Sequence, residues 1–251
     1  MRKYLMLTMA LVGLIAVSVA GIANAGEKPV TAEAGNIKFT FNGGFKPSKL
    51  PKKKMAPIVV TASGQIQTKD GTHPPALKEV EVETDKNGSI NTKGVPACTS
   101  GKLQSRDTKA AEKVCKSSII GTGTTEVEIQ FPEQNPIPVH SKLLVLNGGT
   151  SGGKTTLFIH AYITVPTPAA IVTTVKIKKI HKGRYGLLSV ASIPKIAGGS
   201  GSVKKFSLSV GTKKKVLFAR CPDGKLQAHA LAKFADGTKV SAGIVRTCTG
   251  T

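Results

Sequence analysis

Short runs of alternating apolar and polar residues, with turn signals about every 8–15 residues, constrain this chain more than any other feature. Residues 77–83 read Leu-Lys-Glu-Val-Glu-Val-Glu. This period of two places Glu79, Glu81 and Glu83 on one face of a strand and apolar side chains on the other. Asp-Lys-Asn-Gly at 85–88 is typical of a hairpin turn. Because helical periods are scarce, the pattern predicts an all-β fold, specifically an antiparallel β-sandwich.

The same pattern recurs from residue 37 to residue 245. One short helix is predicted at 108–116, where Asp107 can cap the first turn. Lys176 and Lys178 alternate on one expected strand, and we expect them to be cross-strand partners of the glutamate row. The predicted strands are residues 37–41, 58–66, 77–83, 126–129, 143–146, 155–165, 172–178, 187–193, 203–210, 216–220, 226–234 and 240–245.

The first 25 residues predict export. Arg2 and Lys3 precede an apolar run at 4–22, and Ala23-Asn24-Ala25 follows as a small-x-small cleavage site. This order is typical of a secretory signal peptide at 1–25, and an uncleaved membrane anchor is the alternative. We therefore expect a secreted protein, located outside the cell or in the cell envelope.

The remainder divides by composition into two regions. Residues 26–57 contain one short strand and a proline-broken basic run, which predicts an extended, mobile N-terminal segment. Residues 58–251 form the predicted sandwich region, with possible halves at 58–133 and 137–251. Cys-Thr-Ser-Gly-Lys-Leu-Gln at 98–104 resembles Cys-Pro-Asp-Gly-Lys-Leu-Gln at 221–227. The echo indicates either a duplicated β unit or chance at a common bridged turn that leads into a strand.

Four cysteines, Cys98, Cys115, Cys221 and Cys248, remain after the signal peptide. An even number in an exported chain predicts disulfides, and four cysteines allow three pairings. We favour Cys98 with Cys115 and Cys221 with Cys248, because both pairs are local. No Cys-x-x-Cys occurs and no histidine stands at a ligand spacing from a cysteine, so no metal site is expected.

The formal net charge of the whole chain is +22, and the basic residues are unevenly spread. Residues 134–251 contain 18 basic residues against only Asp223 and Asp236. Such an excess predicts attraction to an anionic polymer of the cell wall, to acidic polysaccharide or to an anionic lipid surface; a solvated charged face is the alternative. The residues expected to contact a polyanion are Lys52, Lys53, Lys54, Lys176, Lys178, Lys179, Lys182, Arg184, Lys213, Lys214 and Lys215.

Other kinds of chemistry find little support in the sequence. The chain lacks tryptophan and has few tyrosines, so specific recognition of nucleic acid by base stacking is not expected. Residues 148–155 match the P-loop pattern, but the β-branched and aromatic stretch after them predicts a hairpin loop. No catalytic group and no cofactor is expected. The working hypothesis is a non-enzymatic binding or structural domain, and the alternative is a secreted hydrolase with an unrecognised site.

Four segments carry a resemblance to a known group of proteins. They are residues 181–186 (His-Lys-Gly-Arg-Tyr-Gly), 193–199 (Ile-Pro-Lys-Ile-Ala-Gly-Gly), 221–227 and 234–238 (Phe-Ala-Asp-Gly-Thr). In these segments the chain resembles uncharacterised secreted β-rich proteins of soil actinobacteria. The resemblance spans most of the chain after the signal peptide. It implies export and no particular activity.

Overall fold

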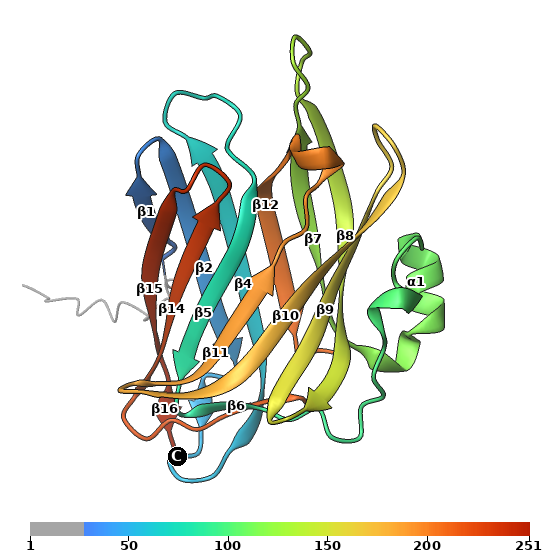
Figure 1. Cartoon of the computed structure of the whole chain (residues 1–251). Coiled ribbons are helices and arrows are strands. Elements are labelled where there is room, and N and C mark those ends of the chain that lie inside the picture. Colours follow the sequence, from blue (N-terminus) through green and yellow to red (C-terminus); the bar gives the residue numbers. More distant parts are fainter. Residues whose placement is uncertain (1–27) are drawn as a thin grey trace, which may run out of the picture.

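The computed structural model describes residues 28–251 and consists almost entirely of β-strands (Figure 1). The predicted signal peptide at 1–25 lies outside the described residues. The strands are β1 (Val30–Ala34), β2 (Ile37–Lys46), β3 (Lys49–Leu50), β4 (Ala56–Thr68), β5 (Leu77–Asp85), β6 (Gly88–Ile90), β7 (Ile119–Ile129), β8 (Ile137–Ser151), β9 (Lys154–Ile163), β10 (Ala169–Lys182), β11 (Tyr185–Ser192), β12 (Gly201–Val210), β13 (Leu217–Ala219), β14 (Lys225–Phe234), β15 (Lys239–Thr247) and β16 (Thr249–Gly250).

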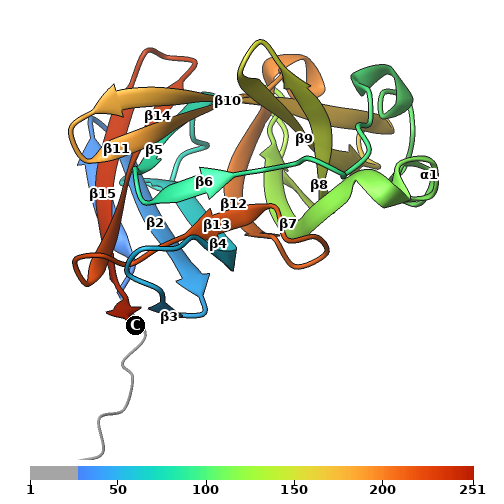
Figure 2. The same cartoon turned by 90° about the horizontal axis from the view of Figure 1, so that it is seen from below.

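Most of these strands belong to one continuous antiparallel sheet. Its order is β1-β2-β4-β12-β7-β8-β9-β10-β11-β5-β14-β15, and β13 joins β4 to β6 at one end. The ladder nearly closes, because β15 lies against β1 and β2. Figures 1 and 2 show the resulting flattened, barrel-like body.

The prediction of an all-β, antiparallel fold is confirmed, but the structure is not clearly a sandwich. A sandwich has two separate sheets, whereas here one continuous series of hydrogen-bonded strands forms both sides of the body. The long strand β10, of 14 residues, crosses between the two lobes of the body in Figure 2. Sequence alternation gives the inward and outward faces of each strand but not which strands pair, so it does not distinguish these two architectures.

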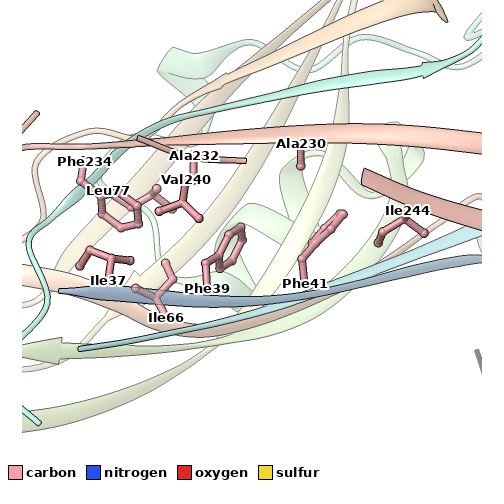
Figure 3. Close-up of a cluster of buried hydrophobic side chains, with 10 residues drawn as sticks. All are labelled: Ile37, Phe39, Phe41, Ile66, Leu77, Ala230, Ala232, Phe234, Val240 and Ile244. Atoms are coloured by element: carbon pink, nitrogen blue, oxygen red, sulfur yellow. The ribbon is translucent and has the colours of Figure 1, made fainter. Parts of the chain in front are cut away.

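Alternating side chains build the core. On β15 the buried residues Val240, Ala242 and Ile244 are separated by exposed ones. Figure 3 shows Val240 and Ile244 facing the rings of Phe39 and Phe41 on β2. Full burial of one such side chain contributes about 1.5–3 kcal/mol, so this cluster stabilises the contact between β2 and the last strand of the sheet, β15.

The expectation of only one short strand in the segment 26–57 is wrong for its described part. Its residues form β1, β2 and β3, and β2 pairs with β4 over ten residue positions. Ile37 and Phe39 are among the most deeply buried side chains. The basic run predicts a loop, which the structure has at 51–55, whereas the apolar alternation at 37–41 indicates a strand with a buried face.

Both predicted disulfides are present. Cys98 pairs with Cys115, and Cys221 pairs with Cys248. The first bond holds the segment that carries α1 (Thr108–Val114), whose first turn is capped by Asp107 through a 2.8 Å bond donated by the Ala110 N–H. The helix predicted at 108–116 is confirmed over Thr108–Val114, and a 3₁₀ turn at Lys116–Ser118 follows it.

The two echoed cysteine segments differ in structure. The segment at 98–104 leads into the 3₁₀ turn Ser100–Lys102 and then into α1, whereas the segment at 221–227 leads into β14. The expected bridged turn before a strand is therefore present only in the second segment. Strands from the two possible halves pair with one another, as β5 does with β11 and β14, and duplication of a β unit stays a prediction.

His160 on β9 anchors the α1 segment to the barrel wall. It is fully buried, and its Nε2 lies 3.0 Å from the Arg106 carbonyl oxygen. No group among the described residues bonds its Nδ1, so a proton there would create a buried charge without an acceptor. Burial therefore lowers the pKa of His160, although the Arg106 carbonyl and the charge of Asp107 act in the opposite direction.

We expect the folded protein to lose stability as the pH falls from about 7.5 to about 5.5. The unfolded state takes up a proton at His160 in this range, whereas the folded state resists it. His160→Gln keeps a neutral donor toward Arg106 and should show a smaller fall in melting temperature over the same range. An equal fall in both proteins would contradict this role of His160.

Candidate functional site

One end of the barrel gathers most of the predicted polyanion-contacting lysines. We call it the basic end; it consists of the loops 51–55, 91–97 and 211–216 and the end of the β10–β11 hairpin at 179–184, at the bottom of Figure 1. Strand β6 crosses this end and pairs with β13, which pairs in turn with β4, so three distant segments lie side by side. A 2.8 Å bond from the Asn91 N–H to the Val216 carbonyl ties the loop 211–216 to the same place. Lysines far apart in the sequence therefore share one surface.

A hollow opens within the basic end. We call it the lysine hollow; its volume is about 520 Å³, and β6, the loop after β6, the β8–β9 hairpin and β10 line it. Lys93, Lys178 and Lys179 line it, and none of its lining residues is acidic. The hydroxyls of Thr92, Thr150 and Thr155 form a chain along it, with oxygen separations of 3.3 and 3.1 Å. Ammonium and hydroxyl groups both donate hydrogen bonds to anions, so an anionic group is the ligand that this lining favours.

The carboxylates nearest the basic end already have partners. Arg184 donates from Nε to the buried Asp85 at 2.6 Å and also contacts Asp223. The hydrogen bond from Arg184 lowers the pKa of Asp223, and the bond to Asp223, followed by that to Asp85, raises the pKa of Arg184. Lys182 pairs with Glu83 at 2.8 Å, and this hydrogen bond raises the pKa of Lys182. Arg184 is therefore engaged mainly within the fold, whereas Lys182 is an exposed lysine that already has one carboxylate partner.

The remaining predicted lysines are unpaired. Within residues 28–251, none of them lies within 4.0 Å of a carboxylate oxygen, and all are exposed. Lys176 stands apart from the others, because it lies farther along the outer face of β10. The unpaired lysines at the basic end are Lys52, Lys53, Lys54, Lys178, Lys179, Lys213, Lys214 and Lys215.

The glutamate row finds different partners from those expected. Lys233 on β14 bonds Glu79 at 2.7 Å and also bonds Glu81, and these bonds raise the pKa of Lys233 and lower that of Glu81. Lys176 and Lys178 lie on the same sheet, but β11 stands between β10 and β5. The predicted direct cross-strand pairing of Lys176 and Lys178 with the glutamates is therefore wrong. The alternation within each strand does not show which strand lies next to it, so the sequence does not reveal that β11 intervenes.

The P-loop-like segment is a hairpin, as predicted. Ser151 pairs with Lys154 across Gly152 and Gly153, both with positive φ, and the chain continues as β9 rather than as a helix. No helix start is available there to hold phosphate. Its Thr150 and Thr155 nevertheless line the lysine hollow.

Groups suited to catalysis or metal binding are sparse in the part of the chain that the structure describes. No cluster of three or more His, Cys, Asp or Glu side chains there fits a metal ion. His73 lies 2.9 Å from Glu128, and the nearby Ser202 hydroxyl donates to the Pro74 carbonyl oxygen instead of to this histidine. Within residues 28–251 no helix has the length and apolar character needed to cross a bilayer.

Comparisons with protein-family models, curated proteins and solved structures find no match to this chain. The resemblance to secreted actinobacterial proteins therefore stays a prediction. Sequence reasoning missed Lys93 and the threonines of the lysine hollow. They come from two separate segments, the loop after β6 and the β8–β9 hairpin, and no local pattern marks them, since only the crossing of β6 beneath the barrel brings them together.

Proposed function

We propose that this protein is an exported, non-enzymatic binding protein whose basic end contacts anionic polymers at the cell surface or outside the cell. The observation that carries the proposal is the lysine hollow, in which Lys93, Lys178 and Lys179 meet threonine hydroxyls without any acidic residue. Repeated phosphate, sulfate or carboxylate groups are the chemistry that such a lining recognises.

Export is supported by two independent features. Two disulfides are typical of proteins that fold in an oxidising compartment outside the cytosol. The first 25 residues have the order of charge, apolar run and small residues of a secretory signal. An exported basic protein meets cell-wall polymers and acidic polysaccharides directly.

A polymer suits the basic end better than a single small anion. The loop 211–216 is bonded to Asn91 of the lysine hollow, and the loop 51–55 leads into β4 at the same end of the barrel, so one chain of negative groups can contact several unpaired lysines at once. Each exposed contact contributes only a few tenths to about 1 kcal/mol. Several contacts act together, and their sum decreases as salt screens them.

The test compares two triple variants that remove the same charge from different places. The first variant replaces Lys93, Lys178 and Lys179 of the lysine hollow by glutamine. The second replaces three exposed lysines of the α1 segment by glutamine, namely Lys109, Lys113 and Lys116. Binding of a fluorescein-labelled heparin fragment is followed by anisotropy at low salt. We expect the first variant to lose about tenfold or more in affinity and the second to lose about threefold or less.

The salt dependence provides the control for folding and for net charge. The hollow variant should also show a shallower fall of affinity with NaCl, because fewer lysines contact the polymer. Melting curves establish that both variants fold. Equal losses in the two variants would show that net charge alone drives binding, and absence of heparin binding by the unaltered protein at low salt would also contradict the proposal.

A further inference from the structure

The interior of the barrel contains a second, chemically opposite space. We call it the apolar cavity; its volume is about 260 Å³, and it lies between the wall of β4, β12 and β7 and the wall of β5, β9, β10 and β11. Its lining contains no charged side chain. Protein interiors are normally packed with few voids larger than a water molecule, so a cavity of this size inside the barrel is unusual.

Small inward-facing residues create this space. Ala161 on β9 and Ser189 and Ala191 on β11 occupy positions where a larger side chain would fill the barrel. Val82 and Ile171 point into the same space yet are only half-buried, because part of their surface faces the cavity. The atoms that line the cavity lack van der Waals partners, and an apolar guest can supply these contacts.

The polar groups of the cavity are few and uncharged. Thr125 donates its hydroxyl to the Lys205 carbonyl oxygen at 2.9 Å. Thr173 and Ser189 also line the cavity, and among the described residues neither hydroxyl has a hydrogen-bond partner. The lining can therefore hold one hydroxyl or carbonyl group of a guest, whereas an ionised group would lose its hydration without a partner.

A layer of apolar side chains separates the apolar cavity from the lysine hollow. Ile177 and Leu187 line the hollow. Val175 and Ser189 are the next inward-facing residues on the same two strands, and they line the cavity. Val216, which is fully buried, packs in the same layer. The two sites are therefore distinct.

The β8–β9 junction is a sparsely bonded seam beside the apolar cavity. The ladder between these strands runs only as far as Leu144 and His160. Beyond that point, the Ser141 side chain takes the place of the backbone hydrogen bonds. Its hydroxyl donates to the Tyr162 carbonyl oxygen at 2.9 Å and accepts from the Tyr162 N–H at 3.1 Å. Leu143 and Ala161, on the two sides of this junction, both line the cavity. Strands joined by so few bonds separate more easily than those joined by a full ladder.

We propose that the apolar cavity binds a small, uncharged, hydrocarbon-rich molecule with at most one polar group. A dry apolar cavity of about 150 Å³ accommodates benzene, so a space of 260 Å³ fits about ten non-hydrogen atoms. Bicyclic hydrocarbons, terpene-like alcohols and medium-chain alcohols have this size and chemistry. The site is independent of the polyanion surface.

Naphthalene is the direct probe, because it has ten carbon atoms and no charge. We expect saturable binding of one molecule per protein, with magnetisation transfer in NMR from naphthalene to the methyl groups of Val82, Ile159 and Val175. These methyl groups line the cavity in the unaltered protein, so this readout does not depend on a variant. Absence of saturable binding, or transfer only to surface methyl groups, would overturn the proposal.

Filling the cavity should abolish binding without unfolding the barrel. Ala161→Leu and Ala191→Leu each add three carbon atoms to the lining, and we expect each to weaken naphthalene binding at least tenfold. Ala170→Leu on the neighbouring strand is the matched control, because Ala170 pairs with Tyr162 on the outer face of the sheet and does not line the cavity. An equal loss in the control would place the site elsewhere.

A pair of competitors tests the charge preference. At pH 8, 1-octanol should displace naphthalene at least ten times more effectively than octanoate, because the cavity offers no partner to a carboxylate. Equal displacement, or stronger displacement by octanoate, would assign binding to the lysine surface and contradict the proposal. Since heparin is not involved, this outcome is independent of the polyanion test.

Discussion

Replacing Asp85 by alanine is expected to lower the free energy of unfolding by about 3–5 kcal/mol, the loss typical of breaking a buried ion pair. Asp85 is only 3% exposed and accepts four hydrogen bonds. The Asn87 N–H and side-chain amide donate to Oδ1 at 2.9 and 3.0 Å, while Arg184 Nε and the Gln227 N–H donate to Oδ2 at 2.6 and 3.1 Å. Alanine leaves these buried donors without an acceptor. Urea unfolding followed by circular dichroism measures the loss.

Asp223→Ala is the matched control, because Asp223 also binds Arg184 but lies at the surface. Water can replace its carboxylate, so we expect only a small fraction of the effect of Asp85→Ala. The two substitutions remove the same charge and the same residue type. If both variants lose equal stability, burial of Asp85 does not determine its contribution.

Removing the disulfide between Cys221 and Cys248 is expected to cost about 3 kcal/mol. The bond closes a loop with a sequence separation of 27, and both cysteines are buried against Leu50 and Leu226. A double substitution by alanine loses the cross-link and leaves part of the sulfur volume empty. The measurement is the urea midpoint of the double variant against that of the unaltered protein under oxidising conditions.

The second disulfide supplies the comparison. Cys98 and Cys115 have a sequence separation of 17, and their bond holds a segment that packs outside the sheet. Its double alanine variant should also lose stability, and local opening should be confined to the α1 segment in hydrogen exchange. If loss of the Cys221–Cys248 bond left the unfolding midpoint unchanged, the stabilising role assigned to it would be wrong.

The sequence contains enough information for the local structure. Period-two alternation predicts nearly every strand from β4 to β15, because one face of each strand is buried. The P-loop-like residues form a hairpin, as the β-branched run after them indicates. Short separations also favoured the two disulfides that the structure contains. All of these features depend on residues close together in the chain.

Features that depend on distant pairings escaped prediction. Closure of the sheet brings β15 against β1 and β2, more than 190 residues apart in the sequence, and no local pattern specifies this contact. Lys93 joins Lys178 and Lys179 only because β6 crosses the end of the barrel. Ala161, Ser189 and Ala191 read as ordinary small strand residues until their common interior is known. Alternation identifies the inward face, but the volume enclosed depends on the whole barrel.

The most direct test of the central claim is to map where an anionic polymer contacts the protein. Amide chemical shifts are recorded by NMR while a short heparin fragment is added at low salt. We predict that the largest changes occur in the loops 51–55, 91–97 and 211–216 and at Lys178 and Lys179, and that they disappear at high salt. Changes spread evenly over the barrel, or concentrated at the opposite end around the β7–β8 and β14–β15 hairpins, would contradict the assignment of the binding surface to the basic end.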